Sequence, residues 1–522
     1  MKAAGIPANA PVRAAAIFLA MVFLLLVARF WHPVYGFTRF LQLDATNDEI
    51  KISAFRTHPV YVYRDTGGYD GLYYAQIAYD PTLTNPELAP AMDNLSYRGR
   101  RILPPALAWL FAAGRPAWIA HTYSLLNVAA WLGLAFILWR LLAVTDWRGL
   151  AAWAGVLFSA GALGSVRFAL TDLIALAFLA AAMLAAEQGR PRTGTGLIAA
   201  AALSRETSVL ALAGVVQRPW FSRVNFRWVL PALLPLVAWF VYLRWQLGRS
   251  ESGWANFSAP FSGLVGKLSA SLAGLAHPGP GEIGPAWATL AATFSLMAQA
   301  VFFVVHRRKE EAWWRVGAIY IGLMVCLGPS VWAGFPGAAT RVLLPLTLAF
   351  NVLAVRGRAA PAWLAAGNLG IFSGLLMITD VHHDTRELEA ARIGGASIVA
   401  RAGEGWYGVE HSARHTWSWN GGRGVLALEV WPQDGRDLRL TCTLRSLNPL
   451  TVTIAQGGAL RWRGTVGPVP APIAFPVTII QGGAQLEFST DSPGTQEAAA
   501  LGGRRLAFAV YDLRFELPET SR

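Results

Sequence analysis

The sequence predicts a polytopic α-helical membrane protein that carries a soluble β-sandwich domain at its C-terminal end. Hydrophobic residues make up 54% of its 522 residues and charged residues only 14%, and the mean hydropathy is +0.39. Long apolar runs fill the chain up to residue 379, whereas short β-branched runs separated by turn residues fill the remainder. These proportions are typical of membrane proteins with several spans and differ from those of soluble domains.

About eleven apolar runs approach the roughly 20 residues that a helix needs to cross a hydrocarbon core of ~30 Å. The first run follows Lys2 and Arg13 and lacks a small-residue cleavage site, so we expect an uncleaved anchor. One run is short, and another is interrupted by Arg205. The runs cover residues 12–31, 102–114, 117–139, 149–165, 168–187, 195–217, 228–247, 285–305, 314–333, 341–356 and 361–379.

Basic loops predict the orientation of the spans, because Lys and Arg in short loops stay on the cytoplasmic side. Three loops are plainly basic, and they begin at Gln217, His306 and Arg356. This places the N-terminus in the cytoplasm and puts residues 32–101, 248–284 and the whole C-terminal region outside. A loop with two arginines from Glu187 also falls outside, so we expect a broken or re-entrant segment within residues 195–217.

After residue 380 the composition changes to that of an antiparallel β-sandwich. Alternating or β-branched segments such as GVLALEV and LTVTIAQ are separated by Gly, Pro, Asn and Asp turns. A length of ~140 residues is normal for one domain. We therefore divide the chain into a transmembrane module, residues 1–379, and a soluble β-sandwich domain, residues 380–522.

The net charge of +13 does not indicate a nucleic-acid partner. The Lys and Arg residues lie mainly in short loops between apolar runs, and no basic stripe of the kind that follows phosphates stands out. The two cysteines, Cys326 and Cys442, lie in an apolar run and in a distant polar region. We therefore expect neither a nucleic acid among the partners nor a disulfide framework.

The long outer loop, residues 32–101, contains GGYDGLYYAQIAYDP, a stretch rich in tyrosines and carboxylates. Loops longer than ~15 residues without their own core are usually functional. Tyr69, Tyr73 and Tyr74 could stack on the apolar faces of a sugar, and carboxylates such as Asp70 could bond to its hydroxyl edges. The competing interpretation is an interfacial helix whose tyrosines anchor it among lipid headgroups while its acids face water.

Three arginines, Arg98, Arg100 and Arg101, follow in DNLSYRGRRILPPALAWLF, directly before an apolar segment. On the outer face, the positive-inside rule does not explain them. Arginine is well suited to gripping a lipid-linked phosphate with two parallel hydrogen bonds. The alternative is a surface cluster that meets anionic headgroups.

Charged residues also interrupt the apolar runs. Arg205 and Glu206 lie within one run, and Arg341 opens another. Ionisable groups at membrane depth are costly and usually pair or line a cavity. For Arg205 and Glu206 we expect either a donor-phosphate role or a structural ion pair, and for Arg341 either phosphate contact or interface anchoring. Asp172 is expected to be a buried hydrogen-bonding group rather than a substrate contact.

The order of these features resembles the membrane glycosyltransferases of the GT-C superfamily. One anchor is followed by a long outer loop with YDGLYYAQIAYDP and then by YRGRRILPPALAWL. Later, LSRETSVL and TRVLLPLTLA resemble a polar turn and an Arg-opened span of such enzymes. The pattern is nearest to bacterial members distantly similar to the PIG-V-type mannosyltransferases, and the resemblance covers residues 12–379.

The resemblance implies inverting transfer of a hexose or pentose from a polyprenyl-phosphate donor to a hydroxyl of a glycan, lipid or protein acceptor. The reaction would take place on the extracytoplasmic face of a bacterial inner membrane, so membrane lipids are also expected partners. A carboxylate must take the proton of the acceptor hydroxyl, and cations must hold the leaving phosphate. We expect Asp70 to be the base, because Gly71 beside it allows close approach, with Asp44 and Asp80 in reserve.

Other classes of function stay open, namely a transporter or lipid flippase and a non-catalytic membrane scaffold. Transporters often have two similar halves with interrupted helices at matching positions, and this sequence shows no such symmetry. A membrane acyltransferase would need a histidine within the membrane, a position for which only His121 qualifies.

No cofactor is predicted, and a role for a divalent metal stays open. Several GT-C families carry an adjacent acidic pair in the outer loop, whereas here only Asp48 and Glu49 are neighbours. His382, His383 and Asp384 lack a second cluster at ligand spacing, so no metal site is predicted there.

Overall fold

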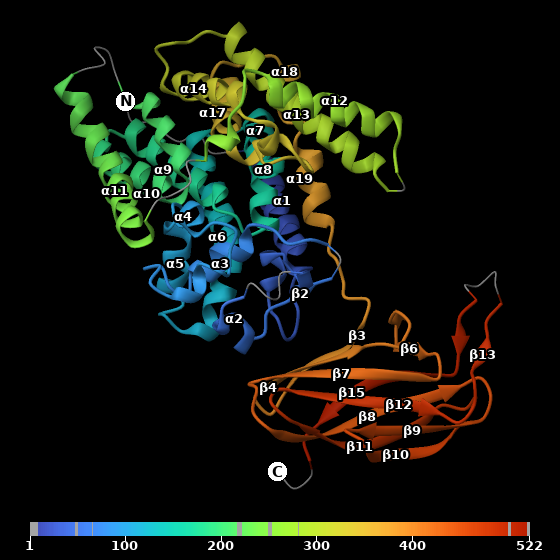
Figure 1. Ribbon diagram of the computed structural model, residues 1–522. Helices are drawn as coiled ribbons and strands as arrows, with labels where there is room; N and C mark the ends of the chain where they lie inside the picture. The colour runs from blue at the N-terminus through green and yellow to red at the C-terminus, as the bar shows by residue number, and fades with distance from the viewer. Residues whose placement is uncertain are drawn as a thin grey trace. The chain divides into compact units, whose positions relative to one another are not determined.

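The computed structural model describes residues 9–46, 51–64, 66–216, 222–248, 253–279, 281–498 and 503–518. The chain divides into two compact units, one built of helices and the other of strands (Figure 1). The first unit comprises residues up to Phe30, Phe37–Ile52 and Asp65–Val381. The second comprises Trp31–Gly36, Ser53–Arg64 and the residues from His382 onward, so two segments of the predicted outer loop belong to the unit of the C-terminal strands.

Five stretches of the described residues in the helical unit are long and apolar enough to cross a membrane. A sixth results if α7 (Trp147–Leu157) and α8 (Ala160–Arg167), which meet at a bend of 43°, form one span. The five are α1 (Ala10–Ala28), α6 (Pro116–Leu141), Asn225–Leu247 within α11 (Arg223–Leu247), α13 (Ile283–Val305) and Pro361–Thr379, which contains α18 (Pro361–Gly367) and α19 (Ile371–Thr379). The prediction of a helical unit with several apolar helices that could cross a membrane is confirmed at this level.

Large apolar side chains on these helices point away from the protein interior. Phe18 and Leu25 of α1 are 64% and 66% exposed, and Val241 of α11 is 63% exposed. Exposed apolar surface of this extent is unfavourable in water and suits a hydrocarbon surrounding.

The other apolar runs also contain helices, but each of these is shorter than the ~17 residues needed for a span. They are α5 (Leu103–Phe111), α9 (Asp172–Glu187), α10 (Pro191–Ser204), α14 (Ala312–Cys326), α16 (Ala339–Val342) and α17 (Leu344–Arg356). The expected interruption at Arg205 is present, since α10 ends at Ser204, Arg205 is extended, and the 3-10 helix η4 (Glu206–Gly214) follows. The total of about eleven spans stays a prediction.

Short elements organise the loops of the helical unit. They are η1 (Thr38–Leu41), β1 (Leu43–Asp44), α3 (Gly71–Ile77), η3 (Pro86–Leu88), α4 (Leu95–Arg98), η5 (Trp254–Asn256), α12 (Ser262–Ala276) and α15 (Pro329–Trp332). At the start of α3, a Cβ atom on Gly71 would lie 2.2 Å from the carbonyl oxygen of Phe168. Only glycine therefore lets Asp70 come this close to the end of α8, as the sequence suggested.

The second unit is a β-sandwich. Its strands are β2 (Val62–Tyr63), β3 (Glu387–Ile393), β4 (Ala396–Ala402), β5 (Glu410–His411), β6 (Thr416–Asn420), β7 (Arg423–Trp431), β8 (Arg436–Ser446), β9 (Leu450–Gln456), β10 (Ala459–Val466), β11 (Ala471–Ile479), β12 (Gly483–Thr490), β13 (Thr495–Gln496), β14 (Arg505–Leu506) and β15 (Phe508–Glu516), and α2 (Ser53–Thr57) also belongs to it. One antiparallel sheet has the order β10-β9-β12-β7-β4-β3 and the other β11-β8-β15-β6-β5.

The two sheets share one hydrophobic core, because alternate residues of their strands face inward. In β8, every second residue from Leu438 to Leu444 is buried. Leu426 and Leu428 of β7, in the other sheet, belong to the same buried cluster. The predicted C-terminal β-sandwich is therefore confirmed.

The two outer-loop segments of the second unit, Trp31–Gly36 and Ser53–Arg64, pack on the sandwich. Tyr35 and Tyr61 are almost fully buried and form one apolar cluster with Val399 of β4. This burial stabilises the segments on the sheet through the aromatic surface that it removes from water.

Arg401 of β4 ties one of these segments to the sandwich. Its guanidinium lies 2.8 Å from Asp384 and 2.6 Å from Glu429, and it donates a hydrogen bond to the Tyr35 hydroxyl at 2.8 Å. Arg401 and Asp384 are buried, with 8% and 5% of their side chains exposed. The positive charge of Arg401 and the negative charge of Asp384 therefore neutralise each other in a surrounding of low polarity.

We predict that Arg401→Leu destabilises the β-sandwich unit by about 3–5 kcal/mol, because it leaves the buried Asp384 carboxylate without its partner. Hydrogen exchange of the β3 and β4 amides in the full-length protein measures this change. Arg439→Leu is the matched control, since Arg439 pairs with Glu516 at 4.0 Å on the surface and its loss should cost less than about 1 kcal/mol. Equal protection in both variants would contradict a stabilising role for Arg401.

Candidate functional site

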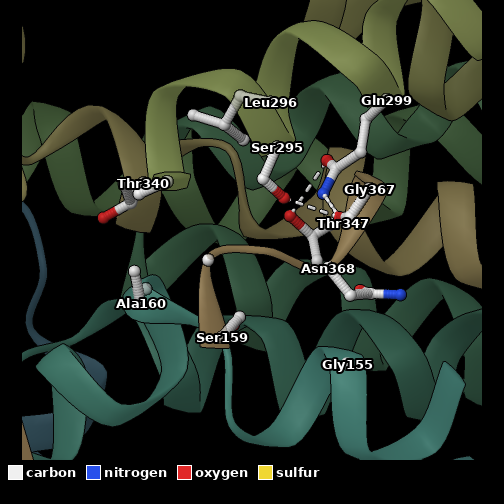
Figure 2. A pocket seen from close by; sticks show the side chains of 13 residues that line it. Gly155, Ser159, Ala160, Ser295, Leu296, Gln299, Thr340, Thr347, Gly367 and Asn368 are labelled. Atoms are coloured by element: carbon white, nitrogen blue, oxygen red, sulfur yellow. Dashed lines mark hydrogen bonds between the residues drawn. The ribbon is translucent and has the colours of Figure 1, made fainter. Parts of the chain in front are cut away.

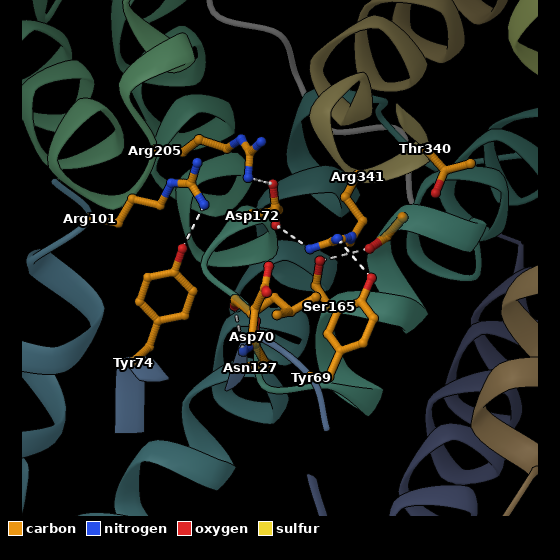
Figure 3. Close-up of polar contacts among 12 residues, drawn as sticks. Tyr69, Asp70, Tyr74, Arg101, Asn127, Ser165, Asp172, Arg205, Thr340 and Arg341 are labelled. Atoms are coloured by element: carbon orange, nitrogen blue, oxygen red, sulfur yellow. Dashed lines mark hydrogen bonds and ion pairs between the residues drawn. The ribbon is translucent and has the colours of Figure 1, made fainter. Parts of the chain in front are cut away.

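A cavity of about 520 Å³ in the helical unit collects most of the charged residues singled out from the sequence. Seven of them line it: Asp70, Arg98, Arg100, Arg101, Arg205, Glu206 and Arg341. They come from the outer loop, from the break between α10 and η4, and from α16. Figure 3 shows several of these side chains converging from separate elements.

Asp70 lies directly before α3 and reaches the cavity wall. One of its oxygens, Oδ1, is 2.9 Å from an Arg98 nitrogen. Burial raises the pKa of the Asp70 carboxyl, but the positive charges of Arg98 and then Arg341 lower it further, so the pKa lies below its ordinary value. Asp70 is therefore ionised at neutral pH, the form that a proton acceptor needs.

Arg98 forms a second and shorter contact with Asp93. Its Nε and Nη2 donate to the two oxygens of Asp93 at 3.0 and 2.6 Å. The guanidinium also lies 4.9 Å from the centre of the Tyr73 ring. Arg98 is thus held in a fixed orientation between two carboxylates and an aromatic face.

Arg101 is 5% exposed and lies in a full set of hydrogen bonds. Its Nε and Nη2 donate to the Glu206 carboxylate at 3.1 and 3.2 Å. Nη1 donates to the Tyr74 hydroxyl at 2.6 Å, and Nη2 to the Tyr97 hydroxyl at 3.1 Å. This network joins the outer loop to the start of η4.

Asp172, the first residue of α9, lies between Arg205 and Arg341 (Figure 3). It is 3% exposed, forms an ion pair with Arg205 and lies 3.4 Å from an Arg341 nitrogen. Arg341 also donates to the Tyr69 hydroxyl at 3.0 Å. Asp172 does not line the cavity itself but holds two arginines that do.

The three tyrosines expected to stack on sugar lie against arginines of the site. Tyr69 and Tyr74 accept hydrogen bonds from Arg341 and Arg101, and Tyr73 lies against Arg98. Tyr74 is 1% exposed, so its ring offers no face to a ligand. The structure thus places these side chains around the cavity as supports for its cations.

Asp44 and Asp80, the reserve carboxylates, do not line the cavity. Asp44 accepts hydrogen bonds from Thr46 and Thr66 at 2.9–3.1 Å. Asp80 accepts bonds from Thr82, Thr84 and Asn85. Burial raises the pKa of each carboxyl, but these hydrogen bonds lower it more, so both carboxylates stay ionised. Asp80 is bound within its own turn, whereas Asp44 is bound by its own turn and by Thr66, 22 residues away.

Sequence reasoning missed Asp93 and Tyr97 as parts of the site. The sequence feature that could have identified them is the start of a helix at Asn94. The Asn94 side chain accepts a hydrogen bond from the Tyr97 amide at 2.8 Å and caps the N-terminus of α4. That short helix turns Asp93, Tyr97 and Arg98 towards one another. Asp172 was recognised only as a buried polar group.

Metal binding receives no support from the described part of the chain. No group of three or more His, Cys, Asp and Glu side chains there could hold a metal ion. Asp384 pairs with Arg401 rather than joining its two histidine neighbours in a ligand set. Asp48 and Glu49 lie outside the described residues.

A second pocket, of about 20 Å³, lies where the α7–α8 and α18–α19 breaks meet (Figure 2). Ser295 and Gln299 of α13 both donate to the Gly367 carbonyl oxygen at 2.7 Å. The Thr347 hydroxyl donates to the Gln299 side-chain oxygen at 3.1 Å. This pocket has room for about one water molecule, and its polar groups stabilise the helix breaks.

The charges around the larger cavity nearly balance. Among the described residues, five arginines and three carboxylates line the cavity, which leaves two net positive charges: Arg98, Arg100, Arg101, Arg205 and Arg341 against Asp70, Asp93 and Glu206. Asp172, which pairs with two of these arginines from behind, reduces the total to one. In a surrounding of low polarity, such a site favours a ligand that carries one negative charge.

Comparison with known protein families, with curated proteins and with solved structures finds no match to this chain.

Proposed function

We propose that the protein is an inverting glycosyltransferase that moves a sugar from a polyprenyl-phosphate donor to an acceptor hydroxyl on the extracytoplasmic face of a bacterial inner membrane. The observation that carries this proposal is the cavity in which an ionised carboxylate, Asp70, lies among arginines and carboxylates that together with Asp172 carry one net positive charge. A donor of this class is a phosphodiester with a single negative charge, so its entry would neutralise the site.

In the proposed reaction, the acceptor oxygen attacks the anomeric carbon from the face opposite the phosphate. The new carbon–oxygen bond forms as the bond to the phosphate oxygen breaks, which inverts the configuration. Asp70 takes the hydroxyl proton, and the arginines hold the departing phosphate. The bonding electrons of the broken bond stay with the phosphate, which leaves as a polyprenyl phosphate monoester.

The proton transfer also keeps the charges balanced. The leaving phosphate gains one negative charge, while Asp70 loses one as it is protonated. Arg98 and Arg341 lower the pKa of Asp70 in the free site. As the phosphate draws these cations, their effect on Asp70 weakens and its pKa rises, so the carboxylate becomes a better base when the donor is bound.

The apolar part of the cavity supports a lipid-linked donor. Phe257, Leu323, Leu327, Val331 and Val342 line it together with the charged residues. Isoprene units next to the phosphate would bury apolar surface against this wall. A water-soluble nucleotide sugar would not use such a surface.

A transporter is the second candidate, because α7–α8 and α18–α19 are both interrupted and pack close together. The pocket at these breaks, however, has room for about one water molecule and not for a sugar or a lipid. Detergent-solubilised protein separates the two candidates, because there a transporter has no compartments to connect, whereas an enzyme would turn over polyprenyl-phosphate sugars.

The proposed topology places the β-sandwich outside the cytoplasm, with about eleven spans before it. Alkaline phosphatase, which is active only outside the cytoplasm, should therefore be active when fused after residue 385. The same reporter fused after Arg358, in a basic loop, should be inactive and serves as the control. The opposite pattern would place Asp70 and its cavity on the cytoplasmic side.

We predict that Arg100→Ala weakens binding of farnesyl phosphate by about 1.5–3 kcal/mol, the cost of losing a hydrogen bond to a charged group. Arg100 lies 5.5 Å from the centre of the Tyr97 ring, on the cavity wall. Arg98→Ala and Arg101→Ala should weaken binding as well, although they also disturb the protein's own ion pairs. Calorimetric titration in detergent measures the affinity.

Arg115→Ala is the control for this series, because Arg115 does not line the cavity, and its affinity should equal that of the parent. If all three cavity variants also bind like the parent, these arginines do not hold the phosphate of the donor.

Asp70→Asn should reduce sugar transfer by about 10²-fold or more, because the amide keeps the size of the side chain but cannot take a proton. Donor affinity should not fall, since the arginines remain. Asp44→Asn and Asp80→Asn should keep their turnover, because both carboxylates lie outside the cavity. Initial rates with a panel of polyprenyl-phosphate sugars measure these effects, and parent-like turnover of Asp70→Asn would remove it as the base.

A further inference from the structure

We infer that Asp172 is a specificity-determining positioning residue, whose negative charge makes the cavity select phosphodiesters over dianionic phosphates. This inference rests on the proposed function, because it concerns the same cavity and the same class of donor. It goes beyond that proposal by assigning the choice between two phosphate classes to one carboxylate that no ligand touches.

The geometry of Asp172 separates it from the groups that can contact a ligand. Arg205 and Arg341 line the cavity, whereas Asp172 lies behind them and is 3% exposed. Its carboxylate forms an ion pair with Arg205 and lies 3.4 Å from an Arg341 nitrogen (Figure 3). Any effect of Asp172 on a bound phosphate therefore passes through these two guanidinium groups and through its charge.

The charge of Asp172 matters because the cavity is nearly neutral. The described residues that line the cavity carry two net positive charges, and ionised Asp172 behind them reduces this total to one. A phosphodiester carries one negative charge, whereas a phosphate monoester above its second pKa, which is about 6, carries two. Asp172 thus matches the cavity to the donor rather than to the monoester product.

The size of this effect follows from Coulomb's law. One charge about 8 Å from a ligand, at an effective dielectric constant of about 20, changes affinity on the order of tenfold or more for each ligand charge. The change in binding free energy is therefore twice as large for a dianion as for a monoanion. The ratio of their affinities therefore reports the Asp172 charge, even if a variant binds both ligands more weakly.

Two probes with the same lipid test the inference on full-length protein in detergent at pH 8. Farnesyl phosphate is the dianion, and its methyl ester, farnesyl methyl phosphate, is the monoanion. In Asp172→Asn, the affinity ratio should shift on the order of tenfold towards farnesyl phosphate. Asp172→Glu keeps the charge and should keep the parent ratio.

A purely structural role for Asp172 predicts a different result. Both probes would then lose affinity by the same factor in Asp172→Asn, and the ratio would not change. That outcome overturns the inference and leaves the proposed function standing. If the parent binds neither probe, the proposed function itself fails, and the inference fails with it.

A second pair of variants covers the case in which Asp172→Asn does not fold. Arg205→Gln removes the positive partner, and Arg205→Gln with Asp172→Asn removes both charges of the pair. These two proteins differ only in the Asp172 charge, so the double variant should favour farnesyl phosphate on the order of tenfold more than the single variant. Equal ratios in the pair would overturn the inference.

Discussion

Ion pairs between arginines and carboxylates join the segments that form the cavity. Arg101 and Glu206 are 105 residues apart in the sequence. Arg341 reaches Asp172 across 169 residues and Tyr69 across 272. These groups are largely withdrawn from water, so a broken pair would leave a buried charge without compensation, a far greater cost than the loss of a surface pair. The arrangement of the outer loop against the helices therefore depends on these pairs.

The same pairs determine what chemistry the cavity can support. Because carboxylates compensate most of the arginines, the site has only a small net positive charge. It can attract a phosphate without binding anions in general very tightly. The neighbouring cations keep Asp70 ionised. In the proposed reaction, a bound phosphate would draw those cations away, so the strength of this carboxylate as a base would be coupled to the presence of the donor. Structure and proposed catalysis thus share one set of interactions.

The second unit, which contains the β-sandwich, also includes two segments of the loop formed by residues 32–101. The sequence passes between the two units after residues 30, 36, 52, 64 and 381. Segments from before Asp70 are buried on the sandwich through Tyr35, Tyr61 and Arg401. Folding of the sandwich therefore fixes points along the outer loop and shortens the free loops between them, which lowers the entropy that the loop loses on ordering.

Local patterns in the sequence determined the apolar helices, the β-sandwich with its alternating core, the break at Arg205 and the set of charged residues worth following. These features depend on spacing along the chain, which a sequence displays directly. Only the tertiary structure decided that Asp44 is bound by the distant Thr66, that Tyr74 supports Arg101, and that Asp172 holds two cavity arginines. The reason is physical: a buried charge is stabilised by whichever opposite charge the fold brings within about 4 Å, and that partner can lie anywhere in the sequence.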